Sequence, residues 1–581
     1  MKWARLVLSL AVIAVVAPSN VRADDLSFEL PVFGQTTFGM TSTTTARYRG
    51  NNYDANLYDD DFFSLYQRFD VSLQGDELRF DMRIDAFVPF TVFENRCPPD
   101  LMSQCYLSWD VRPGATQTGD SVSGTLPERI ALRWEHEGWN IEVGDTQLVL
   151  GRGIALSFRK VDLLGVDNSL RGGHVRFDDG HFRARLHFGL ANPQNQDPID
   201  LRIIQDPEDL VAAGGLGATF GPNDMFSING HLARVWFQDD PEGGSTDRGR
   251  SVDIAGWTFE APALADGQFA LYAEANAMRR TWIDSADRDR QTFGRAVYAS
   301  AQLQLDNLTV LAEWKDYDDF LVATRGDEPR TWRIYSAAPS LEFDGPQRLR
   351  AIGNQRGGGL RVDYAFLPGP WQFSVNSVLY GLGEHDIDPW DGILVSHTWA
   401  TLQRRQEYGE DPVWSMTLIG GYRQETYIHD PTEYMSARAG DVDRQMIHGQ
   451  VDVTIGSGEH SLDIVVDHRL ETERRLIGTG LREFQIGGVS LTYTWSVNFA
   501  AALVLRWTDQ KSGIISQRAM QDYNFLGGEF YPSLELRWNF EPGTYLRGFL
   551  GMTPGGLICS GGVCRDVPPF EGVLLQFVGR L

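Results

Sequence analysis

Charged residues alternate with apolar ones in several segments of the sequence. From 78 to 85, apolar residues take turns with Arg79, Asp81, Arg83 and Asp85. Successive residues of a β-strand point to opposite faces, so these four charges share one face. If this face lines a water-filled pore, the row of charges would select ions and polar solutes by their charge. The alternative is structural, because any wide barrel must have a polar interior, in which charges on neighbouring strands pair with each other. The candidates are Arg79, Asp81, Arg83, Asp85, Arg129, Arg133, Arg176, Arg183 and Arg185.

A second set of polar residues is embedded in apolar sequence between 150 and 172. The stretch LGRGIALSFRKVDLLGVDNSLRG is more apolar than a loop projecting into water requires. A loop folded inward against a wall would use both kinds of residue, so we expect it to constrict an interior. An outward partner-binding loop or a short helix on a rim are the alternatives. The constriction-loop candidates are Arg152, Arg159, Lys160, Asp162, Asp167 and Arg171.

Motifs for catalysis and cofactor binding are weak. The tripeptide Gly119-Asp120-Ser121 matches the nucleophile motif of GDS-type lipases, but it lies in a polar loop without a convincing His and acid partner block. His448, His460 and His468 have acidic neighbours, as scattered histidines in a charged interior often do. The Gly-rich stretch 353–359 lacks the following helix of a phosphate-binding loop. We therefore predict no catalytic residues, no enzyme activity and no cofactor.

Acidic clusters occur at 54–61 and 239–247. Several carboxylates suit a hard cation such as Ca²⁺, but neither cluster has the spacing of a known calcium loop. Solvated loop acids are the favoured interpretation, and we predict no metal site.

The four cysteines form two local pairs, Cys97 with Cys105 and Cys559 with Cys564. Both pairs fall in expected loops, and we predict two disulfides of an oxidising compartment. A metal site is the weaker alternative, because no His or second CxxC lies near either pair.

The connections between the alternating segments are short and long in turn. Turn residues mark short connections such as 75–76, 137–138, 178–180 and 456–459, and one long polar connection lies between successive short ones. A membrane β-barrel shows this rhythm, with tight turns at one rim and long loops at the other. The sequence predicts an all-β fold: a single large antiparallel transmembrane barrel of about 24 strands, within 22–26, with short periplasmic turns and long extracellular loops.

Aromatic residues near the predicted strand ends fit two belts at the membrane interfaces. Those on the turn side are Trp134, Trp139, Trp371, Trp414, Trp495, Trp538 and Tyr545. Those on the loop side are Trp236, Trp282, Tyr317 and Trp507.

The first residues resemble an export signal. Lys2 and Arg5 precede an apolar run too short to span a bilayer, and Val21-Arg22-Ala23 fits a signal-peptidase site. We expect a signal peptide over 1–23, a short periplasmic segment over 24–35 and the barrel over 36–581. The 581 residues carry a formal net charge of −26, which makes nucleic acid an unsuitable partner.

Two stretches resemble a family of uncharacterised proteobacterial outer-membrane proteins with a predicted, porin-like barrel. They are RGNNYDANLYDDDFFSLYQRFDVSLQGDELRFDMRIDAFVPF and GRGIALSFRKVDLLGVDNSLRGGHVRF. The resemblance implies a barrel in the Gram-negative cell outer membrane and brings no established activity. The last residues, alternating up to Leu581, resemble a strand read by the barrel-assembly machinery, with Leu581 in place of the usual terminal aromatic.

Two functions follow from this pattern. The first is a porin-like channel for hydrophilic solutes, narrowed by inward-folded loops. The second is a non-conducting barrel that serves as scaffold or export partner of a periplasmic or surface complex. In both cases the expected partners are outer-membrane lipid and, during biogenesis, the barrel-assembly machinery. A hydrolase or a soluble secreted all-β protein such as a propeller fits less well.

Overall fold

The computed structural model describes most of the chain between Ser27 and Arg580. The description leaves out 1–26, 31–33, 50–61, 92–125, 162–165, 168, 193–208, 223–224, 239–247, 284–287, 324–334, 338, 343–352, 367–368, 384–391, 405–412, 428–441, 476–480, 510–528, 555, 561–562, 568–569 and 581. The expected signal peptide and the pair Cys97 and Cys105 therefore lie outside the described residues.

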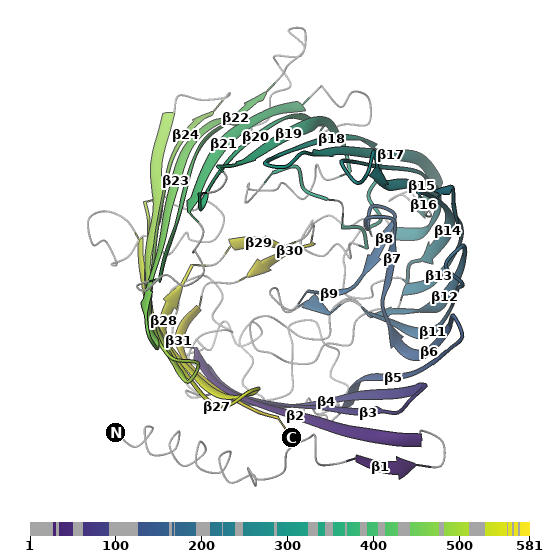
Figure 1. Cartoon of the computed structure of the whole chain (residues 1–581), viewed down its shortest axis with the longest axis horizontal. Coiled ribbons are helices and arrows are strands. Elements are labelled where there is room, and N and C mark those ends of the chain that lie inside the picture. The colour runs from purple at the N-terminus through teal and green to yellow at the C-terminus, as the bar shows by residue number, and fades with distance from the viewer. Residues whose placement is uncertain are drawn as a thin grey trace.

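The chain forms a closed, antiparallel 24-strand β-barrel, which confirms the predicted fold class and strand number (Figure 1). The strands of its first half are β2 (Gly34–Arg49), β3 (Phe62–Gln74), β4 (Leu78–Thr91), β5 (Leu126–His136), β6 (Trp139–Thr146), β11 (Ser169–Asp178), β12 (Phe182–Asn192), β13 (Asp209–Phe220), β14 (Phe226–Trp236), β15 (Arg248–Leu264), β16 (Phe269–Ile283) and β17 (Asp289–Gln304). Those of its second half are β18 (Leu308–Asp318), β19 (Gln355–Ala365), β20 (Trp371–Gly383), β21 (Gly392–Arg404), β22 (Val413–Tyr427), β23 (Val442–Ser457), β24 (His460–Arg475), β25 (Leu481–Trp495), β26 (Phe499–Thr508), β27 (Glu529–Glu541), β28 (Thr544–Thr553) and β31 (Phe570–Arg580).

The first and last barrel strands close the ring. β2 pairs with β31 from Thr41 opposite Arg580 to Arg49 opposite Gly572, and β31 also pairs with β28. A short strand that the sequence did not suggest, β1 (Ser27–Leu30), pairs with the beginning of β2. Closure leaves no unpaired strand edge along the wall, which is the condition for a sheet to cross a bilayer.

Six short strands lie outside the wall ladder, in its connections. β7 (Leu148–Leu150) pairs with β8 (Leu156–Phe158), and β9 (Lys160–Val161) pairs with β10 (Val166–Asp167). In the connection before β31, β29 (Gly556–Ser560) pairs with β30 (Val563–Val567). β7 and β8 lie inside the ring (Figure 1).

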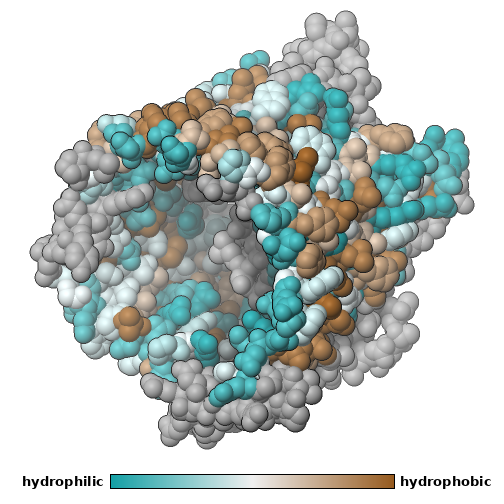
Figure 2. Space-filling model, turned by 45° about the vertical axis from the view of Figure 1, so that its right-hand side comes forward, coloured by the Kyte–Doolittle hydropathy of each residue, from teal (hydrophilic) through white to brown (hydrophobic). Residues whose placement is uncertain are grey.

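Alternation gives the wall two different faces. On β12, Leu186 and Phe188 are more than half exposed on the outside, whereas His187 between them is buried on the inside. Leu216 on β13 and Leu232 on β14 continue the exposed apolar surface. Figure 2 shows apolar residues gathered on the outer wall and hydrophilic ones around the opening. An outer surface of this kind matches the lipid-facing band of a transmembrane barrel.

The tight turns follow from residue type. Glu137 and Gly138 join β5 to β6 with φ of 43° and 85°, the left-handed pair of a two-residue hairpin. Glycine is required at 138, since a Cβ there would lie 2.5 Å from the carbonyl oxygen of Asp178. Such turns fix which residues of the two strands face each other.

The aromatic belts are only partly as expected. Trp139, Trp495 and Trp538 are about half exposed on the turn side. Trp282 and Tyr317, expected in the loop-side belt, are 9% and 1% exposed and face the interior, so that expectation is wrong for them. Each occupies the same strand face as a buried inward residue, Met278 or Lys315, and alternation turns them away from lipid. In the part of the chain that is described, no helix is long and apolar enough to cross a membrane.

Candidate luminal site

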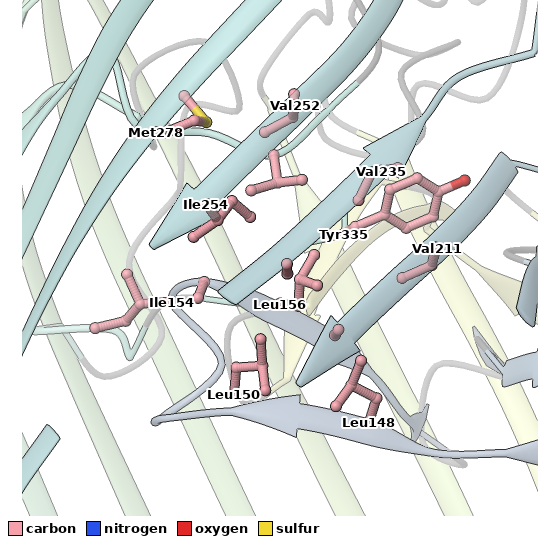
Figure 3. Close-up of a cluster of buried hydrophobic side chains, with 14 of the residues drawn as sticks. Leu148, Leu150, Ile154, Leu156, Val211, Val235, Val252, Ile254, Met278 and Tyr335 are labelled. Atoms are coloured by element: carbon pink, nitrogen blue, oxygen red, sulfur yellow. The ribbon is translucent and has the colours of Figure 1, made fainter. Parts of the chain in front are cut away.

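The segment from Leu148 to Phe158 is packed against the inner wall. Leu148, Leu150, Ile154, Leu156 and Phe158 are at most 1% exposed and belong to one buried cluster. The wall residues of this cluster point inward from β11 to β18 and include Val211, Val235, Val252, Ile254 and Met278 (Figure 3). Full burial of each such side chain is worth roughly 1.5–3 kcal/mol, so the segment is a fixed part of the lumen.

A second inward segment joins the first. After β18, Phe320 to Ala323 and Tyr335 to Glu342, apart from 338, are described, and Tyr335 is fully buried. The amide of Ser157 donates to the carbonyl of Tyr335 at 2.7 Å, and the amide of Ala337 donates to the carbonyl of Gly153 at 2.8 Å. The rings of Phe158 and Tyr335 stack with centroids 5.0 Å apart. We call 148–158, 320–323 and 335–342 together the luminal shelf.

Arg152 is the exposed cation of the shelf, and the wall holds it in place. Its backbone amide donates to Glu274 on β16 at 2.9 Å, and its guanidinium donates to the hydroxyl of Tyr298 on β17 at 3.0 Å. The guanidinium also lies 4.1 Å from the ring centre of Tyr272. Tyr272 and Asn276 donate to the carboxylate of Glu274, which is 1% exposed. A charge fixed by so many contacts can act on a solute without rearranging.

The far end of the shelf is fastened by a buried ion pair. Glu342 accepts from Arg423 on β22 at 2.8 Å, and its side chain and that of Arg423 are 2% and 1% exposed. Nδ1 of His397 on β21 lies 3.0 Å from the carboxylate, and Tyr380 on β20 donates a hydrogen bond to it. Burial alone would raise the pKa of Glu342, but the contacts with His397 and Arg423 outweigh it and hold the pKa at about 2. The carboxylate is therefore ionised at neutral pH.

The predicted pore-lining residues whose side chains are described lie on the inner face, and most of them are paired. Arg79 contacts Asp81 at 2.7 Å, and Arg133 contacts Glu142 at 3.0 Å. Arg176 and Arg183 both approach Asp178, at 2.7 Å and 3.7 Å. Arg129 lies on the same face as Arg133, in β5. The positive charge of the seven predicted arginines is thus partly balanced by carboxylates.

Two more of the predicted residues are held by hydrogen bonds. Arg185 donates to the carbonyl of Val149 at 3.0 Å and so joins β12 to the shelf. Arg83 is 7% exposed and donates to the hydroxyl of Tyr66 at 3.2 Å. The side chain of Asp85, in β4, lies outside the described residues.

The six constriction-loop candidates do not form one group. Arg152 is on the shelf, and Arg159 follows it directly, half-buried. Arg171 belongs to the wall strand β11 and contacts Asp145 of β6 at 3.1 Å. Lys160 and Asp167 are in β9 and β10 with undescribed side chains, and Asp162 is outside the described residues.

The wall away from the shelf carries charges of both signs. Arg444 on β23 contacts Glu473 on β24 at 2.5 Å, and Arg547 on β28 contacts Glu535 on β27 at 2.8 Å. Arg506 on β26 approaches Asp467 on β24 at 3.4 Å. These side chains, other than Glu473, are between a fifth and a half exposed, so water reaches them.

Sequence reasoning missed the residues that hold the shelf. Glu274, Glu342 and Arg423 were not singled out, because each is one charge among many in an alternating pattern. The sequence did contain one signal for the part of the inner wall on which the shelf packs. Segment 209–220 is apolar on both strand faces, whereas a strand between lipid and a water-filled lumen needs only one apolar face.

The arrangement offers little for catalysis. His397 and His448 approach within 2.9 Å, but their neighbours are the structural contacts of Glu342. Among the described residues, no three His, Cys, Asp or Glu side chains are placed to hold a metal ion. The backbone register sets Cys559 opposite Cys564 across β29 and β30. What the site can do chemically is present fixed charges to the space inside the barrel.

Comparison with known proteins gives fold neighbours and no close relative. No family model and no curated protein sequence matches the chain. The siderophore receptor PirA from Pseudomonas aeruginosa is 7% identical, with 94% of this chain and 80% of that one covered and a TM-score of 0.43. The P pilus usher (PapC) translocation pore is 9% identical, with 94% and 99% covered and a TM-score of 0.39. A BenF-like porin from Pseudomonas fluorescens is 11% identical, with 68% and 94% covered and a TM-score of 0.35. These neighbours are outer-membrane barrel proteins, and likenesses this low assign no function to the chain.

Proposed function

We propose that this protein is an outer-membrane channel for hydrophilic solutes, narrowed by the luminal shelf. The single observation that supports this function most is the docking of 148–158 and 335–342 on the inner wall. A closed barrel of 24 strands would be roughly 45 Å across if it were round. The shelf narrows this space, while the charged wall of β23 to β28 keeps it wet.

The charges set the expected selectivity. Arg152 presents an exposed guanidinium on the shelf, and Arg79, Arg133, Arg176 and Arg183 line the neighbouring wall beside their carboxylates. A field between fixed opposite charges orients dipolar solutes and retards apolar ones. The proposed solutes are therefore small and hydrophilic.

Liposome swelling tests the channel directly. Refolded protein in vesicles should admit small sugars and amino acids and exclude large polysaccharides. Vesicles with heat-denatured protein are the control. Swelling equal to that control, from a correctly folded and heat-modifiable barrel, would contradict the channel.

A second candidate is a non-conducting barrel that acts as scaffold or export partner in an envelope complex. The observation that favours it is the extent of the shelf, whose buried cluster runs from β11 to β18 and whose anchor reaches β22. Such a barrel would be silent in vesicles and would co-purify with a periplasmic or surface protein after mild cross-linking.

Export, disulfide formation, barrel assembly and the position of the N-terminal segment are part of the same proposal. Export by the segment 1–23 would be checked by the N-terminal residue of the mature protein, expected at Asp24. The disulfides Cys97–Cys105 and Cys559–Cys564 would be checked by peptide mapping without reduction. Depletion of the barrel-assembly machinery should abolish the folded, heat-modifiable form. The segment 24–35 is proposed to lie at the periplasmic rim.

A further inference from the structure

Charged residues lie on the outside of the barrel wall, where alternation would place apolar ones. On β15, Asp253 contacts Arg234 of β14 at 3.3 Å and Arg279 of β16 at 2.5 Å. Asp253 lies between Val252 and Ile254, which both point into the luminal cluster, so its own side chain points outward. The two arginine side chains are 44% and 48% exposed.

The row continues across the next three strands. Arg295 on β17 approaches Asp318 of β18 at 3.5 Å, and Arg356 on β19 contacts Asp316 of β18 at 2.9 Å. Arg295 is 60% exposed and shares its strand face with Phe293, the outward side chain two residues before it. We call Arg234, Arg279, Arg295 and Arg356 with Asp253, Asp316 and Asp318 the outer ladder.

The outer ladder has a definite height on the barrel. Each member is within six residues of the strand end that leads into a long connection, at 237–247, 284–288 or 319–354. In the proposed orientation this rim faces the exterior, so the ladder is level with the headgroups of the outer leaflet. Four arginines against three aspartates leave a net positive charge there, and guanidinium groups pair with phosphate through two parallel hydrogen bonds.

Beside and below the ladder, the outer wall of these strands carries mainly small side chains, with Val297 of β17, 40% exposed, beside Ala275. The register sets Ala255 of β15 beside Ala277 of β16, and Ala301 of β17 beside Ala312 of β18, with Ala275 and Ala299 between these pairs. All six are on the outward face and are at least partly exposed. Trp257 and Trp314, both nearly half exposed, flank the patch. This shallow surface spans four strands, about 14 Å, and can hold several acyl chains side by side.

We propose that the outer ladder and the alanine surface below it form a binding site for a phosphorylated, multiply acylated lipid of the outer leaflet. The arginines hold its phosphates and the alanine surface receives its chains. The aspartates keep the arginines extended along the wall in the absence of lipid. The inference rests on the outer-membrane location proposed above, but not on channel activity.

The test uses the full-length refolded protein in detergent, with bisphosphorylated lipid A as the probe and native mass spectrometry as the readout. We expect bound lipid on the wild type, and at least a tenfold weaker retention for the double variant Arg279→Gln/Arg295→Gln. Lipid A without phosphates should bind the wild type as weakly as the intact lipid binds this variant. The control Arg79→Gln removes a luminal charge and should retain lipid like the wild type. Heat modifiability confirms that each variant is folded.

Three results would overturn the inference. Equal retention by wild type and Arg279→Gln/Arg295→Gln would show that the ladder does not hold phosphate. Equal binding of dephosphorylated lipid A would reduce the surface to a general apolar one. A wild-type dimer or trimer that the variant loses, with no lipid bound, would make this face a contact between copies of the chain. Fractionation of the native protein away from the outer membrane would instead overturn the location, independently of these outcomes.

Discussion

Glu342 and Arg423 lie 81 positions apart in the sequence and meet inside the barrel at 2.8 Å, both almost fully buried. One belongs to the connection after β18 and the other to the wall strand β22. A buried pair of this kind costs much desolvation, and its loss leaves an uncompensated charge. The contact therefore fixes where the luminal shelf ends.

Removing the cation should loosen the shelf and destabilise the barrel. Arg423→Gln leaves Glu342 and Glu425, which Arg423 contacts at 2.5 Å, buried without their main partner. We expect a loss of about 3–5 kcal/mol of folding free energy in urea unfolding from lipid vesicles. Arg79→Gln breaks an exposed pair with Asp81 and should cost less than about 1 kcal/mol. Equal effects of the two substitutions would contradict the anchoring role.

The anchor also predicts a dependence on acid. The pKa of Glu342 is lowered from 4.5 to about 2, so its contribution to stability is complete above pH 4.5 and is lost as the pH falls towards 2. Shelf docking should be unchanged between pH 7.5 and 5 and weaken between pH 4.5 and 2. Proteolysis of 335–342 in the folded barrel reports this opening. In the Glu342→Gln variant, the rate of this proteolysis should be the same at pH 5 and pH 3. If the rates still differ, another titrating group causes the opening.

A glycine of the shelf offers a matched pair of substitutions. Gly151 has φ of 58°, and a Cβ there would lie 2.3 Å from the carboxylate of Glu274. Gly180, in a tight turn, has φ of 92°, and a Cβ there would meet no atom within 4 Å. Gly180→Ala should cost roughly 1–2 kcal/mol of backbone strain alone, and Gly151→Ala clearly more. Urea unfolding measures the loss of stability for both variants. Equal losses would show that the Glu274 side chain moves away from the new Cβ without an energetic penalty.

The apolar cluster predicts a contrast between the inside and the outside of the same wall. Leu156→Ala should lower the free energy of unfolding by about 2–5 kcal/mol, because Leu156 is fully buried in the shelf. Leu232→Ala on the outer face, where Leu232 is 67% exposed, should cost less. Both are measured by unfolding from the same vesicles. A larger loss for Leu232→Ala would mean that the shelf adds little to stability.

The barrel architecture could be predicted from the sequence, but the packing inside the barrel could not. Alternation in 78–85 and the rhythm of short and long connections predicted the architecture, because strand pleat and rim turns leave direct traces in residue type. Trp282 and Tyr317 were assigned to lipid because aromatic content alone does not tell which face a residue occupies. The pairing of Glu342 with Arg423 depends on how a long connection folds back, and no local pattern encodes such a contact.

The outer ladder is a second feature that the sequence pattern did not predict. Asp253 interrupts an apolar stretch of β15, and a pattern that assigns charges to the lumen places it wrongly. Its outward position follows only from the burial of Val252 and Ile254 against the shelf. Where the inner wall is locally apolar, alternation therefore places the polar residues of the same strands on the outer face.

Single-channel recording in a planar bilayer tests the central claim most directly, with the wild type compared with a variant lacking 152–170. We predict stable conductance steps for the wild type and clearly larger steps for the deletion, since removal of that part of the shelf widens the lumen. Equal conductance of the two folded barrels would contradict the constriction. A folded wild type that never conducts would contradict the channel and favour the scaffold.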